Sequence, residues 1–251
     1  MLTKNEIKTI QSLKIGKYRQ ENKLFVVEGY KMVNELLEST FTTEKICITE
    51  TFNTKNPSFD FHDIIPEIVS EKQMMQISNQ DTPPGVLAVV RIPKQKDLET
   101  DALTLALDGI NNPGNLGTII RTAEWFGIKN IVCSEDCVEV WNPKVIQATM
   151  GSIFRINITK TNLADYIKTI HNNGCPIYGA LLEGEDIYKK EINNNKGCIV
   201  IGSESHGIRP NLLQLITDPI TIPKEGTSAT ESLNASMATA IIVSELWRKL
   251  R

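Results

Sequence analysis

One stretch of the chain, residues 107–127 (LDGINNPGNLGTIIRTAEWFG), holds residue types that could do chemistry. It reads as the end of a strand, a turn, and a helix that begins around Asn115. Gly114 and Gly117 remove side chains where the helix opens, so that free backbone N–H groups can face a ligand. Asn115 suits the N-cap. Arg121 leans back toward the same end, because helical side chains point toward the N-terminus.

The same stretch also has a plainer interpretation, in which NPGN is only a turn and Arg121 a solvated helix residue. Two later loops favour a site. IGSESHGI follows the apolar run at 198–201, and IPKEGTSATESLNAS opens from the short strand that ends at Ile222 and Pro223. Small residues interleaved with Glu, Ser and Asn at three strand ends are typical of a concave site with a few directed polar groups.

Apolar strands alternate with helices from residue 103 to the end of the chain. The pattern predicts strands at 103–108, 130–134, 154–158, 176–182, 197–202 and 219–223, and helices at 115–126, 143–150, 164–172, from 210, and at the C-terminus. Such alternation favours an α/β fold with a mostly parallel sheet covered by helices on both faces. Ligands bind such sheets beyond the carboxyl ends of the strands.

The first part of the chain reads as a small α/β unit behind a basic helix. Apolar residues at helical spacing predict an amphipathic helix over residues 2–18. Strands are expected at 23–29, 44–49 and 86–92, and helices at 30–39 and 70–78. PKQKDLET (93–100) has no apolar periodicity and is the candidate linker, which predicts domains at 1–95 and 96–251.

Composition limits the function classes. The 251 residues carry a net charge of −3, which argues against a protein that coats nucleic acid along its whole surface. Residues 1–31, however, hold seven Lys or Arg against three Glu, which suits a polyanion held at one place. The five cysteines look like reduced core residues, and no metal site is expected. With no apolar run long enough for a membrane and no signal peptide, the expected location is the cytoplasm.

Common catalytic motifs are absent from the sequence. There is no G-x-G-x-x-G and no G-K-[ST], which argues against a dinucleotide fold and a P-loop. GSESHG is not a G-x-S-x-G elbow, because Ser203 occupies the place of the first glycine. A hydrolase that uses Ser205 and His206 is a weak alternative, since adjacent residues do not make a triad.

Three ordered motifs carry a more specific resemblance. NPGNLGTIIRTAEWFG, IGSESHGI and IPKEGTSATESLNAS resemble the three motifs of the TrmH (SpoU) family of RNA ribose 2′-O-methyltransferases. ATMGSIFRI resembles the family's linking segment, and FVVEG with PPGVLAVV resembles its N-terminal substrate-binding domain. The likeness covers nearly the whole chain.

The resemblance implies a SPOUT methyltransferase domain with a deep trefoil knot over 96–251, an RNA substrate-binding domain over 1–95, S-adenosylmethionine as cofactor, and a homodimer. By motif position it implies a catalytic set and a set near the adenosine part of the cofactor. The catalytic set is Asn115, Arg121, Glu204, Ser232 and Asn234, and the cofactor set is Gly202, Ile222, Leu233 and Ala180. The loop from Pro223 to Ser232 is about two residues longer than the usual family pattern.

The physical roles of these residues leave alternatives open. A guanidinium is effectively always protonated, so we favour Arg121 as a group that grips a phosphate and stabilises the forming oxyanion, over a role as general base. Glu204 could order the motif loops or take part in catalysis. Ser232 and Asn234 could be plain helix caps.

Structured RNA is the expected substrate, with ribosomal RNA favoured over transfer RNA because the separate N-terminal domain resembles that branch. The basic arm would contact the RNA, and the N-terminal domain would read its shape. The alternative from another class is a catalytically silent RNA-binding or ribosome-assembly factor on the same fold.

Overall fold

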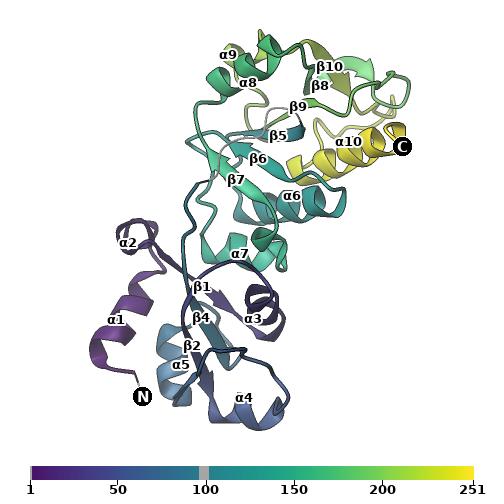
Figure 1. Cartoon of the computed structure of the whole chain (residues 1–251). Coiled ribbons are helices and arrows are strands. Elements are labelled where there is room, and N and C mark those ends of the chain that lie inside the picture. Colours follow the sequence, from purple (N-terminus) through teal and green to yellow (C-terminus); the bar gives the residue numbers. More distant parts are fainter. Residues whose placement is uncertain (1, 96–101) are drawn as a thin grey trace. The chain divides into compact units, whose positions relative to one another are not determined.

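The computed structural model describes residues 2–95 and 102–251, which form two compact units (Figure 1). The first unit holds the chain up to Lys94 together with Glu139–Arg155, and the second holds the rest up to Val138 and from Ile156 onward. The single domain boundary predicted at 95/96 places Glu139–Arg155 in the second domain, whereas in the structure this segment belongs to unit 1. Most of the candidate linker lies outside the described residues.

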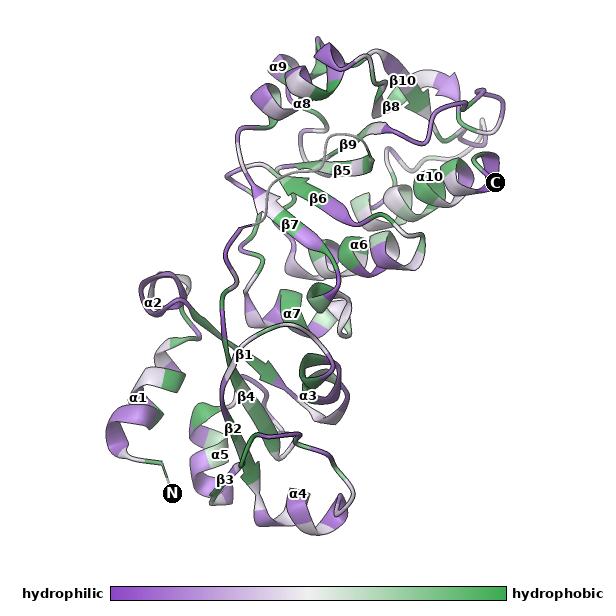
Figure 2. Ribbon diagram, viewed as in Figure 1, coloured by the Kyte–Doolittle hydropathy of each residue, from purple (hydrophilic) through white to green (hydrophobic). Residues whose placement is uncertain are grey.

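Unit 1 is built on a four-stranded sheet in the order β1-β4-β2-β3. The strands are β1 (Leu24–Glu28), β4 (Val86–Arg91), β2 (Thr43–Thr49) and β3 (Glu67–Val69). Pairing is antiparallel except between β2 and β3. The helices include α3 (Tyr30–Leu37), α4 (Glu50–Lys55) and α5 (Glu71–Ile77). Figure 2 shows hydrophobic residues along β1, β2 and β4, which form the centre of this unit's core.

The predicted single helix over residues 2–18 is wrong, because two helices occupy the basic arm. α1 (Lys4–Ser12) and α2 (Gly16–Asn22) are separated by a turn at 13–15. The break follows from burial: Leu13 is only 1% exposed, and its carbonyl accepts a hydrogen bond from Arg19 Nη1 at 2.6 Å. α4 and β3 were not predicted, because residues 50–69 have little apolar periodicity.

The segment Glu139–Arg155 packs onto β1 and α3 of unit 1. It contains α7 (Pro143–Thr149) and a 3-10 turn, η1 (Ser152–Phe154). Glu139 pairs with Arg19, whose side chain is 3% exposed. The Trp141 ring lies 4.7 Å from that of Phe25. A segment that follows β6 in sequence therefore completes the core of the other unit.

Unit 2 is a six-stranded sheet in the order β10-β8-β9-β5-β6-β7, and every pairing is parallel. The strands are β5 (Leu103–Asp108), β6 (Asn130–Cys133), β7 (Asn157–Lys160), β8 (Ile177–Asp186), β9 (Gly197–Gly202) and β10 (Asp218–Thr221). The helices are α6 (Pro113–Trp125), α8 (Leu163–Asn172), α9 (Pro210–Leu213) and α10 (Ala235–Lys249). α8 and α9 cover one face of the sheet, and α6 and α10 the other (Figure 1). The predicted parallel α/β fold is confirmed.

One predicted strand is partly wrong. Residues 154–158 were expected to be extended, but Ser152–Phe154 forms η1 and β7 begins only at Asn157. Phe154 is buried in unit 1, so tertiary packing overrides the strand propensity of the run.

The burial of the cysteines agrees with the expectation that they are reduced core residues. All five cysteines are buried and unpaired. Within 2–95 and 102–251 no group of three or more His, Cys, Asp or Glu side chains is arranged to hold a metal. None of the described helices is long and apolar enough to cross a membrane.

Candidate active site

The helix of the first motif begins two residues earlier than expected. Asn112, not Asn115, is the N-cap of α6, and its Oδ1 accepts the N–H groups of Gly114 at 2.8 Å and Asn115 at 3.2 Å. Pro113 takes the first helical position, where its missing N–H costs nothing. Because Asn115 is relieved of the cap, its carboxamide is available to other groups.

The three motifs meet at a network of side chains. Asn115 Nδ2 donates to Glu204 Oε1. Asn234 Nδ2 donates to Asn115 Oδ1 at 3.1 Å and reaches Glu204 Oε1 at 3.4 Å. Residues separated by 89 and 119 positions in the chain therefore share one cluster.

A tight loop presents Glu204. Ser203 and Gly207 pair across it, with the Gly207 N–H donating to Ser203 O at 2.8 Å. Gly207 takes a left-handed backbone (φ +64), and a Cβ on Gly202 would overlap the backbone of Gly207 and Ile208. The loop can close this tightly only because Gly202 lacks a side chain.

Asn234 caps α10 while it serves the network. Its Oδ1 accepts the N–H groups of Ser236 at 3.0 Å and Met237 at 3.4 Å. Of the two residues expected as possible helix caps, Asn234 is the cap and Ser232 is not, since α10 begins at Ala235. Ser232 is exposed and makes no hydrogen bond with the other described residues of the network.

Arg121 lies on the exposed side of α6. Among the described residues no carboxylate pairs with its guanidinium, which leaves it accessible to an external anion. The opposite side of the helix is core, with Ile119 and Ala123 both fully buried. Gly117, expected to be a bare surface beneath the arginine, is buried as well.

The predicted cofactor residues lie on neighbouring strands or next to them. β8 runs between β9 and β10; Ala180 lies on β8, Gly202 ends β9, and Ile222 follows β10. Gly179 pairs with Val200, so Ala180 lies beside the last residues of β9. Leu233 precedes Asn234 and is 47% exposed. Small and apolar residues with free backbone groups can hold a planar, weakly polar ligand.

Sequence reasoning missed an ion pair beside this network. Asp108, at the end of β5, is fully buried, and Arg209 donates to it from the backbone N–H at 2.8 Å and from Nε at 2.6 Å. The Asp108 carboxylate raises the pKa of Arg209. An aspartate that ends an apolar strand was the available signal, but the sequence did not indicate its partner.

Two side chains in the loop after β6, Ser134 and Cys137, bind the backbone of the first motif. Ser134 Oγ accepts the Gly109 N–H at 2.9 Å, and Cys137 Sγ accepts the Ile110 N–H at 3.3 Å. Cys133, Ser134 and these N–H groups lower the pKa of the Cys137 thiol to about 6. The end of β5 is therefore fixed on the side of β6 as well.

The hydrolase alternative finds little support in the geometry. Ser205 Oγ lies 2.8 Å from His206 Nδ1, and both residues are exposed on the Glu204 loop. Among the described residues no carboxylate bonds to His206, so the third group that orients a catalytic imidazole is missing.

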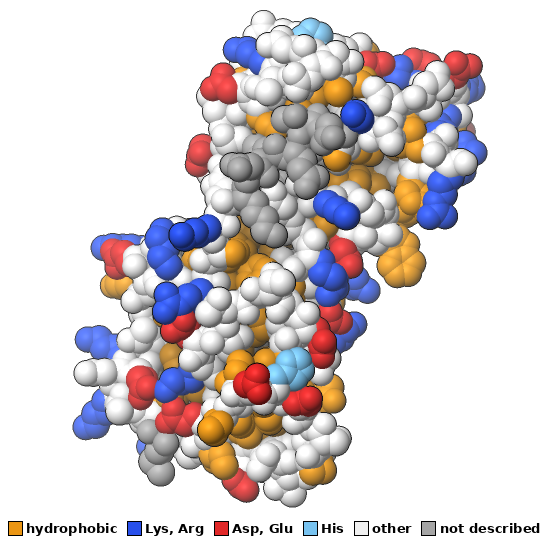
Figure 3. Space-filling view, in the orientation of Figure 1, with side chains coloured by type: hydrophobic (Ala, Val, Ile, Leu, Met, Phe, Trp, Pro, Cys, Tyr) orange, Lys and Arg blue, Asp and Glu red, His pale blue; other side chains and the backbone are white. Residues whose placement is uncertain are grey.

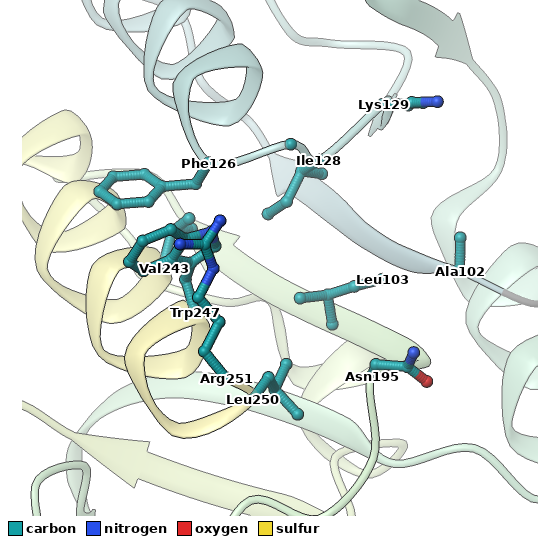
Figure 4. A pocket seen from close by; sticks show the side chains of 11 residues that line it. Ala102, Leu103, Phe126, Ile128, Lys129, Asn195, Val243, Trp247, Leu250 and Arg251 are labelled. Carbon is teal, nitrogen blue, oxygen red and sulfur yellow. The ribbon is translucent and has the colours of Figure 1, made fainter.

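A cavity of about 430 Å³ lies elsewhere in unit 2 (Figure 4). It is lined by Leu103, at the start of β5, and by Trp247 and Arg251, whose guanidinium lies 3.9 Å from the Trp247 ring centre. Asn115 follows the opposite end of β5, so this cavity is not part of the network.

Comparison with known proteins decides the family. Residues 102–244 match the SpoU rRNA Methylase family, and residues 4–88 match the MRM3-like substrate binding domain. The chain belongs to the SpoU rRNA methylase family. The suspected TrmH (SpoU) resemblance is confirmed, and the N-terminal part is a substrate-binding domain of this family's type.

Individual SpoU relatives align along nearly the whole chain. The 23S rRNA (guanosine(2553)-2′-O)-methyltransferase RlmP of Bacillus subtilis is 30% identical over 96% of this chain and 95% of its own. A solved TrmH-family putative RNA methyltransferase from Porphyromonas gingivalis is 38% identical, with a TM-score of 0.90 and 99% of each chain covered. An AdoMet-bound rRNA methyltransferase from Sinorhizobium meliloti is 27% identical, with a TM-score of 0.84 over 100% of this chain and 97% of its own.

Proposed function

We propose that the protein uses S-adenosylmethionine to methylate a ribose 2′-oxygen in structured RNA, with ribosomal RNA the favoured substrate. The observation that carries this is the contact of Asn115, Glu204 and Asn234, which joins the three motifs of the SpoU family in one place. The RlmP relative acts on 23S rRNA, which favours ribosomal over transfer RNA.

The residues fit a bound S-adenosylmethionine. Ala180, Gly202 and Ile222 are small or apolar residues on neighbouring strands or next to them, and the missing Cβ of Gly202 lets the backbone of Gly207 and Ile208 close the adjoining loop. The cofactor would supply an activated methyl group. The protein would hold the ribose oxygen in line with it, and such positioning accounts for much of the rate.

The network and Arg121 would divide the remaining work. Arg121, exposed and without a carboxylate partner in the described chain, would grip a phosphate of the RNA and stabilise the developing negative charge on the ribose oxygen. Asn115 and Asn234 donate to Glu204 and so hold its carboxylate in place. In this role Glu204 orients the site, and the exposed hydroxyl of Ser232 would offer a further polar group to the ligand.

We also propose a homodimer and a trefoil knot, which the resemblance to the family implies. Exposed apolar side chains on α6 and α10 support a subunit interface: Trp125 is 82% exposed, Met237 57% and Trp247 36%. Sedimentation of the wild-type protein and of Met237→Glu would test the dimer, which is expected to dissociate in the variant. The proposed location is the cytoplasm, where ribosomal RNA is assembled into ribosomes.

The basic arm would bind the RNA backbone. Exposed Lys14, Lys17 and Lys23 accompany the half-exposed Tyr18, on which a base could stack. Figure 3 shows Lys and Arg side chains on the side of unit 1 where α1 and α2 lie.

Mapping of ribose methylation across total RNA, with and without the protein and radiolabelled S-adenosylmethionine, tests the activity. One methylated ribose in ribosomal RNA is the expected result. Ribose methylation found in transfer RNA instead would favour the alternative that transfer RNA is the substrate. RNA binding without cofactor binding in calorimetry would identify a catalytically silent assembly factor. Labelling of Ser205 by a serine-reactive probe would instead support a hydrolase.

A further inference from the structure

Arg209 links the ends of three strands of unit 2. It follows the Glu204 loop directly and precedes α9. Its backbone N–H donates to Asp108 Oδ2 at 2.8 Å and its Nε to Asp108 Oδ1 at 2.6 Å. Its Nη2 also lies 3.3 Å from a carboxylate oxygen of Asp136, in the loop after β6.

We propose that Arg209 is a positioning residue for methyl transfer. The inference rests on the proposed function and deepens it. Asp108 lies four residues before the Asn112 cap of α6, and Arg209 lies five residues after Glu204. The Asp108–Arg209 pair therefore ties the base of the loop that leads to Asn115 to the base of the loop that carries Glu204.

Because Asp108 is buried, its hydrogen bonds from Arg209 must be kept. Asp108 is fully buried, and a buried carboxylate is tolerated only when its oxygens are satisfied. Arg209 satisfies both oxygens, one by its backbone and one by its side chain. Because the backbone donor is fixed, the loop cannot slide along β5 without exposing the Asp108 carboxylate to an apolar surrounding.

The tie reaches Glu204 through a short, stiff path. The Ser203–Gly207 pair closes the loop, and Ile208, next to Arg209, is 4% exposed in the core. Only one residue, Ile208, separates Gly207 from Arg209, so a change in the Arg209 contact moves the closed loop as a unit. Glu204 would then lose its alignment with Asn115.

A lysine could not reproduce these contacts. Arg209 reaches Asp108 and Asp136 at the same time with separate nitrogens, whereas a lysine offers one ammonium group on a flexible chain. Arg209→Lys is therefore the informative substitution, since it keeps the charge and loses the geometry.

A double-mutant cycle on the single-turnover methylation rate tests the inference. Arg209→Lys is expected to slow the wild-type enzyme by about 10-fold to 100-fold, the effect of a small misplacement of reacting groups. In a Glu204→Gln background it is expected to slow the reaction by less than about 2-fold, because the group that it positions is already impaired. Equal losses in both backgrounds, or no loss in the wild type, would overturn the inference.

Two controls separate positioning from general damage. Arg248→Lys alters another exposed arginine of unit 2, which pairs with Glu245, and should leave the rate unchanged. If Arg209→Lys fails to fold, Asp108→Asn with Arg209→Gln replaces the ion pair by a neutral hydrogen-bonded pair. This double variant should have a melting temperature near that of the wild type and still methylate slowly. A wild-type methylation rate would overturn the inference.

The failures are distinguishable. If the wild-type protein methylates no ribose in any RNA, the proposed function falls, and the positioning role falls with it. If the wild-type protein is active and the cycle shows no coupling between Arg209 and Glu204, only the positioning role falls.

Discussion

Asn234 shows how one side chain can serve both the fold and the site. Its oxygen caps α10 and its nitrogen faces Asn115 and Glu204. The two possible roles, helix cap and site residue, are therefore not exclusive, and loss of Asn234 would weaken the helix start and the network together. Arg121, by contrast, stands apart from these contacts and should affect activity without affecting the fold.

Removal of the Arg121 guanidinium should therefore abolish turnover and spare stability. We expect Arg121→Ala to lower kcat by about 100-fold to 1,000-fold, the usual loss when a group that stabilises a developing oxyanion is removed. Arg121→Lys should recover little of this, because a lysine cannot bind a phosphate through two parallel N–H groups. Single-turnover kinetics and calorimetric titration with S-adenosylmethionine would check both. Full turnover in Arg121→Lys would contradict the assigned role.

Glu6 provides a pH test in unit 1. Lys45, which donates to Glu6 Oε1, and the Thr3 capping contacts lower the pKa of Glu6 to about 2. A lowered carboxyl pKa stabilises the fold above the ordinary glutamate pKa of 4.5, and this contribution is lost as the pH falls from 4.5 toward 2. Lys45→Met should return the pKa of Glu6 toward 4.5 in an NMR titration. Lys17→Met, which removes a lysine from an exposed pair with Glu21, should not change it.

At the residue level the sequence indicated the network but not what surrounds it. Asn115 was indicated by its place at a helix start, and Glu204 and Asn234 by the resemblance to the SpoU motifs; the strand ends indicated that the loops would come together. Arg209 could not be selected, because an arginine in a loop after a strand is usually solvated and its buried partner is 101 positions away. The N-cap was misplaced for a local reason: Asn112 and Asn115 are both suitable caps, and Pro113 decides in favour of the first.

At the level of elements, apolar periodicity predicted the strands of unit 2 and most of its helices. It failed where packing or burial decides. The turn at 13–15 exists because Leu13 is buried, and η1 replaces a strand because Phe154 packs into unit 1. The loop after β9 was predicted as a loop at a strand end, but its tight closure, which depends on Gly202 and Gly207, was not predicted.

Gly202→Ala tests that loop. The added methyl group would overlap the backbone of Gly207 and Ile208, so the loop must open and Glu204 must leave Asn115. We expect the free energy of unfolding to fall by about 1–3 kcal/mol, typical of overpacking. The free energy of cofactor binding should weaken by more than this. Thermal unfolding and calorimetry would measure these. Gly226→Ala is the matched control for stability, since nothing lies within 4 Å of its added methyl group; equal melting temperatures for both variants would argue against the close approach.

On the scale of the whole molecule, charge separates the tasks of the two units. The chain has a net charge of −3, yet residues 1–31, which include α1 and α2, hold seven Lys or Arg against three Glu. The family match of residues 4–88 to a substrate-binding domain agrees with this distribution. RNA affinity and methyl transfer should therefore respond to different substitutions.

The combined variant Lys14→Gln, Lys17→Gln and Lys23→Gln should weaken RNA binding and leave cofactor binding intact. Each lysine that neutralises a phosphate contributes about one unit to the salt dependence of binding, so the slope of log affinity against log salt should fall by about 2–3. Filter binding at several salt concentrations would measure it. Lys189→Gln, at an exposed lysine of unit 2, serves as the comparison. An unchanged slope would place the RNA elsewhere.

The order of the chain also has a consequence for its synthesis. As translation proceeds, the first 94 residues emerge without Trp141 and Phe154, the aromatic partners of Phe25 and Phe41. The nascent N-terminal part must leave these apolar rings open until Arg155 has cleared the ribosome, and by then β5 and β6 have already been made. Maturation of the two units is thus interleaved in time, and a fragment cut at residue 95 would carry an uncovered, aggregation-prone surface.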